Sequence, residues 1–341
     1  MPHFQPFTTD TLKSYLKVRP NEVKLGQQIL IESPDRTKAN YVLVGLPEDI
    51  GVRANHGIGG TQTSWPAFLQ AFLNIQSTAD LPGDDLCLYG QLDVSDLSIN
   101  PEENNVDKLR NAVEQIDRSV EKIIYNITAA DKIPIVIGGG HNNTYPIIKG
   151  AVRGYAQNKR IASPSINAIN LDAHADFRPL EGRHSGNGFR YAFSEGHLDR
   201  YAVIGLHRNY NAASMLENMQ NESRIDLTFW EDIFLKKTLS FDQAIQRALG
   251  FTRGNLSGIE LDLDCIENVL SSATTPSGVS TLQARQYIHQ TAGFANVAYV
   301  HICEGAASLS DGRKDQSVSK LIAYLVSDFI REHRKNNLRF D

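Results

Sequence analysis

The sequence predicts a single α/β domain with a doubly wound, mostly parallel sheet and helices on both of its faces. Two observations predict this class: short apolar runs rich in β-branched residues recur along the chain, and amphipathic segments at helical spacing lie between them. Strands that alternate with helices form parallel sheets, because each crossover helix packs back onto a face of the sheet. We see no internal repeat or Pro/Ser-rich linker, so we place the domain at residues 40–335 and expect residues 1–39 to form a peripheral extension.

The expected strands are continuous apolar runs, which suit strands buried on both faces. They are Tyr41–Leu46, Ile133–Ile137, Ile166–Leu171, Tyr201–Leu206, Gly258–Asp264 and Val297–Glu304. The clearest expected helix runs from Val106 to about Ala129, where apolar residues recur at helical spacing. Further helices are expected at Trp65–Ile75, Phe241–Leu249, Ser280–Gly293 and Ser317–His333.

The composition is that of a globular protein and argues against several functional classes. Of the 341 residues, 41% are hydrophobic and 21% are charged, which is enough apolar material for a sizeable core. The formal charge of -5 argues against a nucleic-acid binder, which would carry a basic domain or stripe. No apolar run is long enough to cross a membrane, and Met1–Leu30 lacks the features of a secretory signal. The three cysteines share no CxxC spacing, so we expect a cytoplasmic protein without a disulfide framework.

Polar residues follow three of the expected strands at the point where each strand ends. Ligands of open α/β sheets bind beyond the carboxyl ends of the strands, so these side chains are expected to meet at one edge. If the backbone stays extended, alternate residues within each segment also point the same way. The candidates are two histidines and four carboxylates: His141, Asp172, His174, Asp176, Asp262 and Asp264.

Four carboxylates at one sheet edge would repel one another, and burying them unpaired would cost several kcal/mol each. Two divalent cations remove this difficulty, and a ligand set rich in oxygen with a few imidazoles suits Mn²⁺. Two such cations can act together as a clamp in hydrolysis. Each segment alone also has an ordinary explanation, since an isolated segment can be a solvated loop, a surface turn or a tight turn after a strand. Their occurrence together, each after a strand, favours the two-metal site.

These segments resemble those of the arginase/agmatinase/formimidoylglutamase family, the manganese ureohydrolases. Family members carry GGDH, DAHxD and SxDxD segments that form a two-metal site, and the similarity extends over about residues 40 to 330. The resemblance implies two Mn²⁺ ions per chain, bridged by Asp172 and Asp262. It implies that one imidazole and one carboxylate complete each metal site: His141 with Asp176, and His174 with Asp264.

The resemblance also implies roles for residues around the metals. Glu304 stands where the family has a substrate-contacting glutamate and would orient a cationic amidine. Asp264 would carry a proton to the leaving nitrogen. Residues 51–57 resemble the early GVxxNxG loop at the rim of the site, which includes Asn55.

Several positions depart from the family pattern. Gly140 replaces the aspartate of GGDH, Asn142 follows the histidine where serine is usual, and Glu260 replaces the serine of SxDxD. Phe189 stands where arginases have a histidine proposed to shuttle protons, and His184 is a candidate replacement if its loop folds inward. These departures leave open a catalytically silent member that serves as a binding or regulatory protein.

The segment after Asp176 is expected to line the substrate pocket, and it fits formimidoylglutamases better than arginases. An anionic substrate such as N-formimino-L-glutamate needs cationic partners, for which guanidinium groups are well suited. The alternative for each arginine is a surface ion pair. The candidate substrate contacts are Asn55, Arg178, Ser185, Asn187, Arg190, His207 and Arg208.

The resemblance therefore leads us to expect a two-manganese hydrolase that cleaves the C–N bond of an amidino or guanidino amino acid. Formimidoylglutamase is favoured, with glutamate and formamide as products. Arginase, with ornithine and urea as products, and an enzyme for another guanidino acid are the alternatives. The family resemblance further suggests a homo-oligomer.

Overall fold

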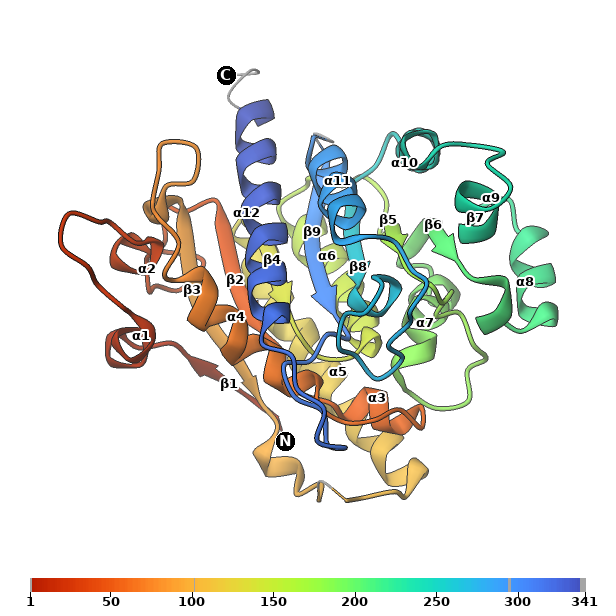
Figure 1. Cartoon of the computed structure of the whole chain (residues 1–341), viewed down its shortest axis with the longest axis horizontal. Coiled ribbons are helices and arrows are strands. Elements are labelled where there is room, and N and C mark those ends of the chain that lie inside the picture. Colours follow the sequence, from red (N-terminus) through yellow and green to blue (C-terminus); the bar gives the residue numbers. More distant parts are fainter. Residues whose placement is uncertain (1, 101, 294–295, 338–341) are drawn as a thin grey trace.

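The computed structural model describes residues 2–100, 102–293 and 296–337. Within them the chain forms one nine-stranded sheet with the order β1-β3-β2-β4-β9-β8-β5-β6-β7 (Figure 1). All neighbouring strands are parallel except β1, which runs antiparallel to β3 at one edge. The strands are β1 His3–Pro6, β2 Tyr41–Gly45, β3 Leu86–Asp93, β4 Ile133–Ile137, β5 Ile166–Leu171, β6 Leu198–Leu206, β7 Ile225–Phe229, β8 Ser257–Asp262 and β9 Val297–Cys303.

Helices cover both faces of the sheet, and the predicted fold class is confirmed (Figure 1). On one face α4, α10, α11 and α12 pack in a single apolar cluster with side chains such as Phe68, Ile245 and Phe329. On the other face α5 to α8 pack in a second cluster around Val113, Ile147 and other apolar side chains. The helices are α1 Thr9–Tyr15, α2 Leu25–Gln28, α3 Ile50–Ala54, α4 Ser64–Phe72, α5 Val106–Ala129, α6 Thr144–Gln157, α7 Gly188–Ser194, α8 Ala213–Gln220, α9 Trp230–Phe234, α10 Phe241–Phe251, α11 Thr281–Ala292 and α12 Ser317–Asn337.

The first 39 residues contribute to the sheet edge. Strand β1 pairs with β3 from His3↔Asp93 to Pro6↔Gly90, and Leu25 is fully buried in the cluster of the α4 face. None of the helices in the described residues is long and apolar enough to span a membrane.

Three of the expected strands end earlier than the sequence suggested: β2 stops one residue early, at Gly45, and the other two changes affect the site. Strand β8 stops at Asp262, and Leu263–Cys265 form a short 3₁₀ turn. Strand β9 stops at Cys303, and the next residue, Glu304, has a positive φ of 61°. A side chain at such a backbone position leaves the alternation of the strand, so both endings redirect residues that the sequence assigned to the site.

Candidate metal centre and active site

The candidate ligands and Glu304 lie at the carboxyl ends of four adjacent strands, in the order β4, β9, β8 and β5. His141 follows β4, Glu304 follows β9, Asp262 ends β8 and Asp172 follows β5. The register pairs Ile137 with Ile302 and Asp262 with Cys303, so these strand ends lie level with one another. The parallel sheet therefore brings segments that are far apart in the sequence to one edge, as the sequence predicted.

The ligand atoms form two groups, within each of which all atoms lie within 4.8 Å of one another. In the first group His141 Nδ1 lies 2.8 Å from Asp176 Oδ2 and 3.2 Å from Asp172 Oδ2 and from Asp262 Oδ2. In the second group His174 Nδ1 lies 3.2 Å from Asp264 Oδ2 and 3.6 Å from Asp172 Oδ1. Asp172 belongs to both groups, which is the position a bridging carboxylate requires.

Local turns, and not strand alternation, direct these side chains. Asp172 Oδ1 accepts a hydrogen bond from the backbone N–H of His174 at 2.7 Å, and Asp262 Oδ1 accepts one from that of Asp264 at 2.8 Å. Asp176 has a positive φ of 45°. The expectation of an extended Asp172–Asp176 segment is therefore wrong. Short polar side chains that bond to backbone two residues ahead bend the chain, and here they gather the ligands in a turn.

The donor set fits divalent cations. Nδ1 of His141, which faces the cluster, and Oδ1 of Asp264 have no hydrogen-bond partner among the described residues, although both atoms are buried. Burial, together with the charge of Asp172, raises the pKa of Asp176 to about 6. Burial and the charges of Asp264 and Asp172 raise the pKa of Asp262 well above its ordinary value. Cations would reverse this repulsion and occupy the unpaired ligand atoms.

Glu304 lies beside the cluster and helps to hold the histidine loop. Its Oε1 accepts a hydrogen bond from the backbone N–H of His141 at 2.9 Å. Burial and the charge of Asp264 raise its pKa to about 8. It lines the same pocket as Asp262 and Asp264, so its carboxylate is available to a cationic group that enters there.

The departure at Gly140 has a steric explanation. A Cβ at this position would lie 2.6 Å from Asn142 Oδ1 and 2.9 Å from Val52 Cγ2. The Asn142 side chain thus occupies the space that an aspartate at 140 would need, so the two departures from the family pattern depend on each other.

Glu48 is a buried carboxylate that the sequence analysis missed. It accepts hydrogen bonds from the backbone N–H groups of Gly51 and Gly140, both at 3.1 Å, and from Asn143 Nδ2 at 2.7 Å. Burial raises its pKa. These bonds join the rim loop after β2 to the loop that carries His141. The sequence signal is weak: an acidic residue shortly after an apolar strand.

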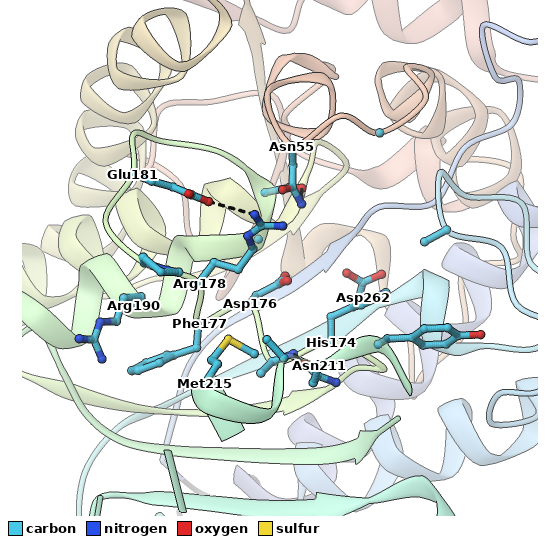
Figure 2. Close-up of a pocket in the computed structure, with 18 of the residues that line it drawn as sticks. Asn55, His174, Asp176, Phe177, Arg178, Glu181, Arg190, Asn211, Met215 and Asp262 are labelled. Carbon is cyan, nitrogen blue, oxygen red and sulfur yellow. Dashed lines mark hydrogen bonds and ion pairs between the residues drawn. The ribbon is translucent and has the colours of Figure 1, made fainter. Parts of the chain in front are cut away.

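A pocket of about 760 Å³ opens onto the cluster (Figure 2). It is lined by residues of the cluster and by Glu304: His174, Asp176, Asp262, Asp264 and Glu304. Four of the expected substrate contacts also line it: Asn55, Arg178, Ser185 and Arg190.

The two arginines of the pocket differ in their surroundings. Arg178 is half exposed and pairs with Glu181 at 3.1 Å, and Figure 2 shows it beside Asn55. The guanidinium of Arg190 stacks over the Phe177 ring at 5.1 Å and points away from Asp262 in the same view. Arg178 is therefore the cation nearer to the centre of the pocket.

The structure does not bring the other expected contacts into the pocket. Asn187 is buried and bonds to the loop around it, including Arg183 Nη1 at 2.7 Å. His207 is stacked between the rings of Tyr210 and Trp230. Arg208 pairs with Asp232 at 2.8 Å on the surface. These three positions correct the expectation of direct substrate contact, because loop, core and surface partners already hold their side chains.

His184 also lies outside the pocket. Its side chain is fully buried, Nδ1 accepts the backbone N–H of Gly186 at 3.1 Å, and Nε2 lies 3.2 Å from Glu181 Oε1. Burial and the nearby charge of Arg110 lower its pKa to about 4. With both ring nitrogens engaged in the loop, His184 has a structural place and is not positioned to shuttle protons.

Arg183 is a second residue that the sequence analysis missed. Its guanidinium is buried, pairs with Asp117 of α5 at 2.8 Å, and donates to the backbone carbonyl of Asn142 at 2.7 Å. Together with its bond to Asn187, these contacts connect the pocket loop to the histidine loop. Nothing in the local sequence distinguishes it from the surrounding arginines.

The fold and this cluster define a class: an α/β protein with a candidate site for two metal ions at the carboxyl edge of its parallel sheet. The model of the arginase family matches residues 39–330. Formimidoylglutamase from Streptococcus pyogenes is 30% identical over 252 residues, which cover 72% of this chain and 68% of that protein. This chain belongs to the arginase family, and it is a hydrolase that acts on amidino groups.

Solved structures support the same fold. Formiminoglutamase from Trypanosoma cruzi with Mn²⁺ superposes with a TM-score of 0.71 at 20% identity, over 92% of this chain and 98% of that one. Formimidoylglutamase from Bacillus subtilis has a TM-score of 0.71 at 16% identity, over 94% and 95% of the two chains.

Proposed function

We propose that this protein is a formimidoylglutamase, which hydrolyses N-formimino-L-glutamate to L-glutamate and formamide with two Mn²⁺ ions. One observation carries the proposal: a single pocket is lined by residues of the carboxylate–histidine cluster, by Glu304 and by Arg178. The substrate has the matching charges, an amidine at one end and two carboxylates at the other. The 30% identical relative from Streptococcus pyogenes bears the same name.

The proposed ligands of one cation are His141, Asp172, Asp176 and Asp262, and those of the other are Asp172, His174, Asp262 and Asp264. When bound, the cations lower the pKa of water and polarise the group that it attacks. Asp172, and in our proposal Asp262, balances the charge of both.

The protein's own residues bind and orient the substrate. Glu304 accepts hydrogen bonds from the amidinium and places its trigonal carbon over the cluster. Asp264 accepts a proton at its carboxylate and delivers it to the leaving nitrogen. Arg178 pairs with a substrate carboxylate in exchange for Glu181, and Asn55 and Ser185 donate to the same end of the substrate.

Product assays on the purified, Mn²⁺-loaded protein test this proposal. We expect glutamate and formamide from N-formimino-L-glutamate, and little urea from L-arginine. Glu304→Gln is expected to lower kcat/KM strongly with both Mn²⁺ ions retained. Urea formation as the main activity would establish the arginase alternative. The Ser185-Gly186-Asn187 segment, which matches the SGN of arginases, favours that alternative. Inactivity on both substrates would refute the assignment and leave other guanidino acids as candidate substrates.

A catalytically silent family member would be expected to hold less Mn²⁺ than the proposed enzyme. Fewer than one tightly held Mn²⁺ per chain after dialysis would favour a binding or regulatory role. The structure argues against it, because the changes at Gly140 and Asn142 compensate each other sterically. We further propose that the protein works in the cytoplasm and forms a homo-oligomer. Sedimentation of the full chain would test the oligomeric state.

A further inference from the structure

A further carboxylate, Glu260, lies on β8, the strand that ends at the proposed metal ligand Asp262, but deeper in the sheet. It sits on β8 two residues before Asp262 and is fully buried. Its neighbour across the sheet is His301 of β9. The site already described uses neither residue.

Four polar groups surround this carboxylate. His301 Nδ1 lies 2.7 Å from Glu260 Oε2, and the Tyr299 hydroxyl donates to Oε1 at 2.7 Å. The hydroxyl of Thr144 also donates to Oε1. The fourth group is His141, whose Nε2 lies 3.4 Å from Oε2. Glu260 is thus a buried anion at which β9 and the histidine loop meet.

The two ring nitrogens of His141 face different partners. Nδ1 faces the cluster, 2.8 Å from Asp176 Oδ2. Nε2 has no hydrogen-bond partner among the described residues and lies 3.4 Å from Glu260 Oε2. An imidazole that binds a metal through Nδ1 carries its proton on Nε2, and that proton needs an acceptor when the ring is buried. Within the described residues, Glu260 is the one carboxylate recorded within 4.0 Å of this nitrogen.

We propose that Glu260 is the positioning residue for the metal ligand His141. Its Oε2 accepts the Nε2 proton and so fixes the tautomer and ring orientation in which Nδ1 points at the cations. The inference rests on the proposed metal centre but not on the identity of the substrate. It gives a role to the exchange of the family's serine for glutamate at this position.

The size of the effect follows from the general behaviour of such partners. Residues that orient a metal-bound histidine contribute about 10–100-fold to metal affinity. Because Glu260 touches one ligand of one cation, the loss is expected at one of the two Mn²⁺ sites. A merely structural role would instead lower the stability of the fold without this selectivity.

Tyr299→Phe provides the matched control. It removes a hydrogen bond to the same buried carboxylate, yet it leaves Oε2 and His141 in place. It therefore measures what a disturbed hydrogen-bond network costs when the histidine keeps its acceptor.

The experiment is a Mn²⁺ titration of the full-length protein without substrate, followed by electron paramagnetic resonance. Glu260→Gln is compared with wild type, with Tyr299→Phe, and with both His141→Asn and the His141→Asn/Glu260→Gln double variant. We expect Glu260→Gln to weaken one site by about 10–100-fold. Tyr299→Phe is expected to change neither site by more than about threefold, and Glu260→Gln is expected to add no more than that to His141→Asn.

Thermal unfolding in the presence of a chelator shows whether each variant folds. If Glu260→Gln does not fold, Glu260→Asp keeps the charge but withdraws it from Nε2, and the same comparison applies. An unchanged affinity in a folded variant would overturn the proposal. A loss of Mn²⁺ affinity of the same size when Glu260→Gln is added to His141→Asn would also overturn it. An equal loss in Tyr299→Phe would overturn it as well. These outcomes are independent of the product assays, since no substrate is present.

Discussion

Removing the charge of Asp117 should destabilise the protein far more than removing that of an exposed ion pair. Asp117 accepts from the Nε of Arg183 at 2.8 Å, and the side chains are only 9% and 2% exposed. Asp117→Asn leaves a buried guanidinium without its counter-charge. Breaking a buried pair in this way costs about 3–5 kcal/mol, a large part of the roughly 5–15 kcal/mol that stabilises a typical domain.

The assay is chemical unfolding of the Mn²⁺-loaded protein at pH 8. Burial raises the pKa of Asp117 to about 6, so the carboxylate is ionised at this pH. The control is Asp84→Asn, which breaks an exposed pair with Lys38 whose side chains are 56% and 70% exposed. That change should cost about 0–1 kcal/mol.

Arg183 also donates to Asn187 and to the carbonyl of Asn142, so Asp117→Asn should raise KM as the pocket loop loosens. If Asp117→Asn costs no more than Asp84→Asn, the pair of Asp117 and Arg183 does not join the two loops as described.

Three further predictions test other parts of the structure. Asp172→Ala should abolish binding of both Mn²⁺ ions while His174→Ala leaves a partly occupied site, because Asp172 belongs to both ligand groups; metal analysis that finds two ions in Asp172→Ala would contradict this. Gly140→Asp should lower the melting temperature through overpacking worth about 1–3 kcal/mol, and Asn142→Ser should partly restore it; no drop in Gly140→Asp would refute the steric account. Burial and the charge of Arg160 lower the pKa of His333 to about 4. The unfolded state therefore takes up this proton first, and stability is lost as pH falls from about 6.5 to 4, by roughly 3 kcal/mol. The unfolding free energies of wild type and His333→Asn, measured in a chelator, should converge over that range; a constant difference would contradict the assignment.

The six central strands, from β2 to β6 in the order of the sheet, could be predicted from the sequence because their residues are mostly buried on both faces. Ile133–Ile137 and Ile166–Leu171 form strands with the predicted bounds; the first is entirely apolar, and the second is interrupted only by the buried Asn167 and Asn170. Strand β3 was not predicted because Gly90 and Gln91 interrupt its apolar pattern. Strand β7 was not predicted because Asp226 and Thr228 interrupt its pattern. Strand β1 is a four-residue edge strand with mostly exposed side chains. Its pairing with β3 depends on contacts that no local pattern records.

The same distinction applies to the site. The ligands could be predicted because each follows a recognisable strand in a recognisable segment. Their orientation could not, since it depends on turns that begin at Asp172 and Asp262. Glu48 and Arg183 act through partners 95 and 66 residues away, Asn143 and Asp117, so only the folded chain identifies them. His207 was misassigned because a position just past a strand end can lie in the core as easily as in the pocket.

Anomalous diffraction at the manganese absorption edge tests the central claim most directly. Crystals of the Mn²⁺-loaded protein should show two peaks per chain, one beside His141, Asp172 and Asp176 and the other beside Asp172, His174 and Asp264. Asp172 should lie within coordinating distance of both. A single peak, or two peaks that do not share Asp172, would contradict the two-metal centre.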